Sequence, residues 1–182
     1  MKDYRYFCLL LIVTIFFLAT GSLSSQTSLK GNYVVSLDPK DLDGNWHLSM
    51  SSACKWKSKK RCNANLRFSV QAAEVAKELK YTKRKKSKTD TQVYLKGESS
   101  HFIPKETGVK RLFARSWYVV AMDKDKQWMV LYFSGTLFHR EEIEVISRET
   151  KINESGMKEF DKLREENYFL HAKAKKMRNV CL

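Results

Sequence analysis

The sequence predicts a mainly-β protein, a closed antiparallel barrel followed by one C-terminal helix. Residues 44–51 alternate between apolar and polar side chains, which is typical of a strand with one buried face. Residues 117–133 form two strand-like runs around a short polar turn, which indicates a hairpin. Beyond Ser155, three apolar residues recur at helical spacing with charged residues between them: Met157, Phe160 and Leu163.

The N-terminal residues 1–21 have the pattern of a secretory signal peptide. Two basic residues precede an apolar run at 7–19, and small residues follow at the positions that a signal peptidase reads. The alternative, a membrane anchor, needs about 20 apolar residues, and this run is shorter. We therefore expect cleavage near Gly21, a loose polar leader at 22–32, one domain at 33–182, and a protein that is secreted or held in a secretory-pathway lumen.

Four further strands are predicted between Cys62 and Arg115, each from a short run with apolar residues in alternation. They cover residues 65–70, 75–81, 91–97 and 109–113. By propensity alone, residues 72–80 also fit a helix.

Three regions resemble the signature regions of the lipocalins, in the same order and at similar spacing. They are Gly44-Asn45-Trp46, the hairpin turn at Asp123, and the strand that ends in Arg148 before a helix. The turn reads Met122-Asp123-Lys124, so only the aspartate matches the usual Thr-Asp-Tyr. The resemblance implies an eight-stranded up-and-down barrel with one helix outside, a strand rather than a helix at 72–80, and Arg148 packed across Trp46.

The resemblance also implies a cavity that holds one small ligand, as antiparallel barrels of this size can. With strand alternation, the likeness to retinol-binding and bacterial lipocalins assigns ten residues to its wall: Leu48, Met50, Trp117, Val119, Ala121, Trp128, Val130, Tyr132, Glu144 and Ile146. Such a wall is aromatic and mostly apolar. It predicts a carrier for a fatty acid, retinoid, sterol or similar molecule, unless the same residues fill a solid core.

Glu144 is the acid on this predicted wall. A buried carboxylate has to be paired or protonated, because an unpaired buried charge is costly. We expect its partner to be Arg115, Lys110 or the ammonium group of a ligand, which favours polar-headed or amine-bearing ligands. A register shifted by one residue would instead put Glu144 in water.

An enzyme on the same scaffold, of the isomerase or de-epoxidase type, is the alternative function. The isomerase type needs a reactive cysteine in the cavity, and Cys54 is the candidate. The four histidines have no metal-ligand spacing, and the sequence has no phosphate loop or nucleophile elbow. No metal, cofactor or catalytic residue is therefore predicted.

Three cysteines remain once the signal peptide is removed: Cys54, Cys62 and Cys181. In an oxidising compartment an odd number predicts one pair and one free thiol. The residues around Cys62 resemble the second-strand entry of apolipoprotein D-like lipocalins, whose cysteine is tied to the C-terminal tail. That resemblance implies a Cys62–Cys181 disulfide, and Cys54–Cys62 is the alternative.

The chain is strongly basic, with a formal net charge of +14. The excess is concentrated at residues 55–61, 77–88 and 173–178, which suits a glycosaminoglycan or anionic lipid headgroups. The centre of the second cluster is Lys83, Arg84, Lys85 and Lys86, which could equally be a solvated hairpin loop. A nucleic-acid partner is not favoured, because no aromatic residues lie within residues 83–88.

The residues before the C-terminal helix carry two signals. Asn153-Glu154-Ser155 is the only N-glycosylation sequon, and we expect Asn153 to be exposed. Ser155 is the predicted helix cap.

Overall fold

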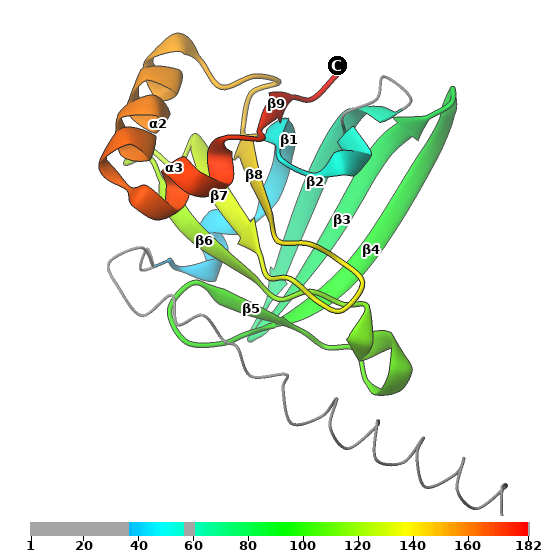
Figure 1. Ribbon diagram of the computed structural model, residues 1–182. Coiled ribbons are helices and arrows are strands. Elements are labelled where there is room, and N and C mark those ends of the chain that lie inside the picture. The colour runs from blue at the N-terminus through cyan, green and yellow to red at the C-terminus, as the bar shows by residue number, and fades with distance from the viewer. Residues whose placement is uncertain (1–36, 57–60, 182) are drawn as a thin grey trace, which may run out of the picture. The chain divides into compact units, whose positions relative to one another are not determined.

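Eight antiparallel strands close into a barrel, because the first strand pairs with both the second and the eighth. Figure 1 shows the computed structural model, which describes residues 37–56 and 61–181. The barrel strands are β1 (Gly44–Ser51), β2 (Arg61–Gln71), β3 (Glu74–Lys83), β4 (Lys86–Lys96), β5 (His101–Pro104), β6 (Trp117–Met122), β7 (Trp128–Phe133) and β8 (Glu142–Ser147). This confirms the predicted eight-stranded antiparallel barrel. The predicted signal peptide and leader lie outside the described residues.

Three short 3-10 helices accompany the barrel, and a helical layer follows it. The 3-10 helices are η1 (Pro39–Leu42), η2 (Cys54–Trp56) and η3 (Gly108–Leu112), and the last elements are α2 (Glu154–Glu166), α3 (Tyr168–Ala174) and the short strand β9 (Arg178–Asn179). Among the described residues, no helix is both long and apolar enough to cross a membrane.

Two helices follow the barrel where one had been expected. The second helix, α3, forms because the Asn167 side chain caps it, accepting a hydrogen bond from the Leu170 amide, and because Leu170 and Ala174 are buried. The cap of α2 is likewise Asn153, which accepts from the Gly156 amide, and not the predicted Ser155. Asn153 is exposed at this cap.

The strand at residues 75–81 is confirmed as part of β3, whereas the predicted strand at 109–113 is wrong. Gly108 has a left-handed φ of 59°, and the chain after it turns into η3, whose apolar residues are not buried. The strand that pairs with β4 and β6 is instead β5, which had not been predicted.

Aromatic rings fill the middle of the barrel. Trp117 is fully buried, and Phe102 stacks on it with ring centroids 4.0 Å apart. Phe68 and Tyr94 pack on the same indole at 5.7 and 5.6 Å. This part of the interior is a packed core without room for a ligand.

The signature residues lie where the barrel is closed by η1. The Arg148 guanidinium lies 3.7 Å from the centre of the Trp46 ring. Gly44 has a φ of 100°, and a Cβ there would lie 3.1 Å from an Arg148 nitrogen, so only glycine suits this approach. In the β6–β7 turn, the Asp123 carboxylate accepts a 2.8 Å hydrogen bond from the Trp128 amide.

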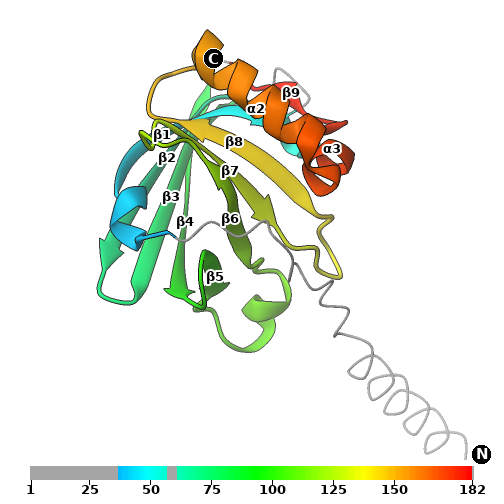
Figure 2. The same ribbon diagram turned by 90° about the vertical axis from the view of Figure 1, so that its left-hand side faces the viewer.

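The helices α2 and α3 cover the outer face of β7 and β8, as Figure 2 shows. Trp128 packs edge-on against Phe160 of α2, and Tyr132 packs against Phe169 of α3. Both faces of β7 are therefore buried, one by the core and one by the helices.

The C-terminal tail is fixed to the barrel by a disulfide between Cys62 and Cys181, which confirms the predicted pairing. The short strand β9 pairs with Met50 and Ser51 of β1, and the Asn63 amide donates to the Cys181 carbonyl at 2.8 Å. The tail thus lies between β1 and β2, beyond the last residues at which these two strands pair with each other, His47 and Asn65. Cys54 is free and exposed.

One strand edge is incompletely paired. β4 pairs with β3 along its whole length, but with β5 only from Tyr94 to Lys96. Within the described residues, the outer edge of β4 at residues 86–92 thus has no neighbouring strand.

Candidate ligand-binding site

A cavity of about 500 Å³ opens where the β1–β2, β5–β6 and β7–β8 connections meet. Lys55, Phe113 and His139 each reach it from one of these connections. The remaining lining residues are Leu66, Lys77, Leu79, Thr89, Asp90, Thr91, Gln92, Tyr94, Arg115, Phe133 and Glu144. The volume suits one small molecule, but the wall carries more polar and charged groups than the aromatic, mostly apolar wall that was predicted.

Lys77 is the central cation of this cavity. Its side chain comes from β3 and is only 8% exposed. The ammonium lies 4.6 Å from the Phe133 ring centre and 5.4 Å from that of Tyr94. Burial lowers the pKa of Lys77 to about 8, although the charge of Glu144 acts in the opposite direction. Within the described residues Lys77 makes no hydrogen bond or close ion pair, so its charge is available to a ligand.

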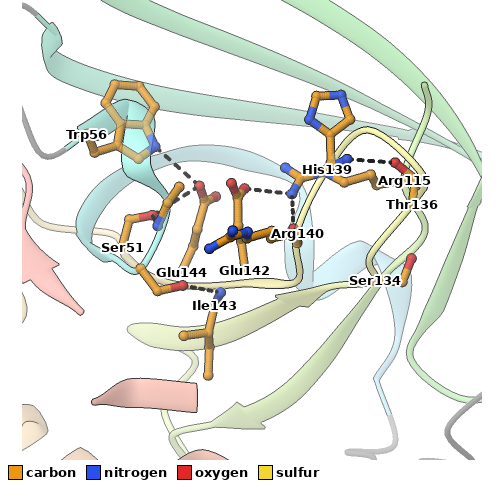
Figure 3. Close-up of polar contacts among 12 residues, drawn as sticks. Ser51, Trp56, Arg115, Ser134, Thr136, His139, Arg140, Glu142, Ile143 and Glu144 are labelled. Atoms are coloured by element: carbon orange, nitrogen blue, oxygen red, sulfur yellow. Dashed lines mark hydrogen bonds and ion pairs between the residues drawn. The ribbon is translucent and has the colours of Figure 1, made fainter. Parts of the chain in front are cut away.

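Glu144 lines the same cavity and is held by two donors. Ser51 donates to its carboxylate at 3.4 Å and the Trp56 indole N–H donates at 3.3 Å, as Figure 3 shows. With Lys77 as the nearby charge, these donors compensate the buried carboxylate. The partners that had been expected, Arg115 and Lys110, do not fill this role.

Arg115 instead pairs with Glu142, which precedes Glu144 on β8. Its guanidinium lies 2.6 Å from the Glu142 carboxylate and also donates to the Arg140 carbonyl at 3.3 Å. Figure 3 shows this pair beside Glu144. Lys110 lies in the exposed helix η3. The positive charge of Arg115 is therefore largely neutralised, unlike that of Lys77.

Of the ten residues assigned to the wall, four point into the barrel but lie in the packed core. Leu48, Trp117, Val119 and Ile146 belong to the continuous apolar cluster and do not line the cavity. In the described part of the chain, Glu144 is the one of these ten residues that lines the cavity.

Met50 and Ala121 face outward, contrary to the predicted alternation. The register shifts between Leu48 and Met50 in β1, and between Val119 and Ala121 in β6. Each shift is a β-bulge, and an extra residue turns every later side chain to the opposite face. Met50 consequently pairs with an outward residue of β8, and Ala121 pairs with one of β7.

Trp128, Val130 and Tyr132 also face outward, so their assignment to the wall is wrong. In the β6–β7 pair, the inward Trp117 and Val119 lie opposite Phe133 and Leu131. Directly paired residues share a face, so Met129, Leu131 and Phe133 are the inward set. The outward set forms the surface on which the helices pack.

Lys77 was not assigned to the cavity from the sequence, although the alternation of side chains in β3 indicates that it faces inward. Val75, Leu79 and Tyr81 alternate on the inner face of β3, and Lys77 falls in the same phase. A lysine between apolar residues of one strand face predicts a buried cation. Tyr94 is similarly buried, and its burial raises the pKa of its hydroxyl.

The expected anion-binding residues form a tight turn at the tip of the β3–β4 hairpin. Arg84 and Lys85 both have positive φ, 51° and 66°, as a two-residue turn of this kind requires. Both side chains, and that of Lys86, are exposed. Over residues 37–56 and 61–181, no cluster of histidine, cysteine and acidic side chains could hold a metal ion.

The fold of the chain resembles that of solved lipocalin structures. Insecticyanin from the tobacco hornworm Manduca sexta matches with a TM-score of 0.66 and 11% identity over 82% of each chain. The siderocalin Ex-FABP matches with a TM-score of 0.61 and 13% identity, over 78% of this chain and 95% of its own. The cockroach allergen Per a 4 matches with a TM-score of 0.61 and 12% identity, over 83% of this chain and 92% of its own.

These likenesses define the class of structure: the chain has the lipocalin fold, as its three signature regions had indicated. At the level of sequence, no protein-family model and no curated protein matches it.

Proposed function

We propose that the protein is a secreted carrier that binds one small molecule with an apolar body and an anionic head group. The observation that carries this proposal is the buried Lys77 ammonium, which lies in the cavity between two aromatic rings and has no close carboxylate partner. A carboxylate or phosphate head would supply that partner, because a charge-assisted hydrogen bond compensates a buried ammonium. Fatty acids and retinoid acids have this chemistry.

An anionic head group is favoured over the amine that Glu144 alone had suggested. Glu144 already accepts from Ser51 and Trp56 and lies in the field of Lys77. A ligand amine would therefore have to compete with these groups and would lie near the like charge of Lys77. Glu144 instead favours the protonated form of Lys77 and partly offsets the effect of burial on its pKa.

Binding is favoured over catalysis by the position of the free thiol. Cys54 is exposed and is not among the residues that line the cavity. An isomerase-type reaction would need that sulfur at the bound ligand. One similar structure, the siderocalin, is described as functioning through dual ligand specificities, which supports a binding role for the same fold.

A comparison of two lysines on the same strand tests the proposal. Lys77→Met should weaken binding of a fluorescent fatty acid by about ten-fold or more, because it removes a charge-assisted contact. The matched control is Lys80→Met, whose side chain is exposed on β3. Binding of the corresponding fatty alcohol should change little in either variant. Equal fatty-acid affinity of the Lys77 variant and the parent would refute the proposal.

Secretion is supported by the signal-like residues 1–21 and by the disulfide, since disulfides persist in oxidising compartments. Expression of the full chain in a eukaryotic secretory host tests it. The expected product in the medium begins near Ser22, and glycosidase treatment should reveal whether Asn153 carries a glycan. Retention of the chain in the cytosol would contradict the proposal.

The basic turn at residues 83–86 is a further proposed anion-binding surface. Within the described part of the chain, none of its four cations pairs with a carboxylate. Replacement of Lys83, Arg84, Lys85 and Lys86 by serine should reduce retention on heparin. Unchanged elution would leave the turn as a solvated loop.

A further inference from the structure

Two loops at the mouth of the cavity expose an unusual number of large apolar side chains. The connection before β6 and the connection before β8 lie side by side at this end of the barrel (Figures 1 and 2). They carry Val109, Leu112, Phe113, Leu137 and Phe138, which are most of the large apolar side chains that the described surface exposes. Leu137 is 81% exposed and Val109 is 72% exposed. Clustered exposure of this kind marks an interaction site.

The two loops form one patch. The Phe113 and Phe138 rings stack with centroids 4.6 Å apart and an interplanar angle of 19°. We name the five apolar residues of these loops the rim patch. It is held together across the loops, so that the side chains on both sides are presented to one partner.

Cations flank the rim patch. Lys110 and Arg111 lie within η3 between its apolar residues, and Arg140 follows Phe138 in the other loop. Within the described residues these three cations make no ion pair. Nearby acids are already engaged, since Glu141 pairs with Lys173 and Glu142 pairs with Arg115. Glu106 is the acid near the start of the first loop.

We propose that the rim patch docks on an anionic phospholipid bilayer. Protruding apolar side chains with cations beside them are the combination by which peripheral proteins enter the interface, with the apolar groups in the acyl boundary and the cations at the headgroups. Charge complementarity selects an anionic bilayer over a neutral one.

Docking in this way places the cavity mouth against the membrane. Phe113 and His139 belong to the two loops and also line the cavity. A ligand with an apolar body could then pass between bilayer and cavity without crossing water. This transfer step rests on the proposed ligand-binding function, whereas docking itself does not.

Co-sedimentation of the full chain, secreted and purified, with lipid vesicles tests the docking. The parent should bind phosphatidylcholine vesicles that contain about a third phosphatidylserine more tightly than pure phosphatidylcholine vesicles. A double variant, Leu137→Ser with Phe138→Ser, should lose on the order of ten-fold in binding to both. Tyr168→Ser is the control, because Tyr168 is as exposed as Leu137 but lies at the start of α3.

The cations are tested by charge reversal. Replacing Lys110 and Arg111 with glutamate should weaken binding to anionic vesicles by about five-fold or more for each cation, and should change binding to neutral vesicles little. The control is the reversal of Lys158 and Lys162, two exposed lysines on the outer helix α2. Equal losses in the two double variants would show attraction by net charge alone and would overturn the proposal.

Insertion of the rim patch into the bilayer can be detected directly by fluorescence. A Phe138→Trp variant should show a blue shift of indole emission on anionic vesicles, because its ring enters the acyl boundary. No shift, or no binding of the parent to either vesicle, would overturn docking; self-association of the parent through the same residues would do so as well.

The test separates docking from ligand binding. The serine double variant should keep the parent's affinity for a fluorescent fatty acid in vesicle-free solution, and its melting temperature should stay near that of the parent. If the parent binds no fatty acid but still docks through the rim patch, the carrier function fails and docking stands. If fatty-acid binding is normal and the rim variants bind vesicles like the parent, docking fails.

Discussion

Arg148 contacts the Trp46 ring and also binds the backbone of the residues that precede Trp46. The guanidinium lies over the indole and donates to the carbonyls of Asp41, Asp43 and Asn45 at 2.9, 2.9 and 3.2 Å. The Trp46 N–H donates in turn to the Leu42 carbonyl at 2.6 Å. The two side chains thereby join β8, β1 and η1 at the end of the barrel opposite the cavity.

Replacing Arg148 by methionine should therefore destabilise the protein by about 2–4 kcal/mol, because it removes a cation–π contact and hydrogen bonds from a charged donor. Urea denaturation of parent and variant measures this difference. Fatty-acid affinity should be retained, since the cavity lies at the other end. A variant as stable as the parent would show that η1 is held by other contacts.

Gly156→Ala tests the outward position of Trp128. A Cβ at residue 156 would lie 2.9 Å from a Trp128 carbon and 2.8 Å from Ile152, which is too close for real contacts. The helix α2 would have to move off β7, at a loss of about 1–3 kcal/mol. Lys158→Ala on the same helix should stay within about 0.5 kcal/mol of the parent. No loss in the Gly156 variant would contradict this packing.

The burial of Lys77 predicts a rise of stability with pH. Its pKa falls from 10.5 to about 8 on folding, so between these values the unfolded chain holds a proton that the folded chain has released. Stability of the ligand-free parent should thus increase from pH 8 to pH 10.5, and below pH 8 the full penalty applies. Lys77→Met should remove that penalty, on the order of 3 kcal/mol at pH 7.

Denaturation of parent and Lys77→Met at pH 7 and pH 9.5 checks this directly. Their difference in unfolding free energy should shrink at the higher pH, whereas the difference between the parent and Lys80→Met should remain constant. A constant difference in both pairs would mean that Lys77 is not desolvated.

The same titration predicts how ligand affinity varies with pH. Fatty-acid binding should weaken above pH 8, approaching ten-fold per pH unit, because the free protein then has to take up a proton at Lys77 before it binds an anion. The fatty alcohol should show no such dependence. Competition assays with both ligands across this range distinguish a head group on Lys77 from purely apolar binding.

The disulfide should contribute strongly to stability because it spans 119 residues. Loss of Cys62 and Cys181 to serine should cost about 4–5 kcal/mol in the chain-entropy model. Cys54→Ser should cost little and should remove the exposed thiol of the barrel domain. Thermal unfolding and thiol titration measure the two effects. A reactive Cys62 in the parent would contradict the pairing.

The side-chain facing of β8 could be predicted from the sequence, that of β1 and β6 only as far as their bulges, and that of β7 not at all. In β8, Glu144 and Ile146 alternate with two apolar residues that the helices need as a packing surface. The bulge in β6 lies among Val119, Val120 and Ala121, whose uniformly apolar side chains give no signal of an extra residue. Every residue of β7 is buried, so apolar character does not distinguish its two faces.

The cavity wall was mispredicted for a related reason. The prediction assumed that inward residues line the cavity, but large rings such as Trp117 and Phe102 fill the middle of the barrel. Which inward residues border a void depends on the summed volumes of side chains from distant strands. That sum is set only when the strands are assembled. The position of Lys77, in contrast, follows from the alternation of β3.

The half-paired edge of β4 has a consequence for the behaviour of the protein in concentrated solution. Residues 86–92 present backbone groups to which a strand of another copy could add, and such edges promote association of sheets into aggregates. Lys86 and Lys88 lie along this edge and are exposed. Lysines on an exposed edge are one of the means by which proteins disfavour such association, so the basic hairpin should help to protect this edge against sheet addition.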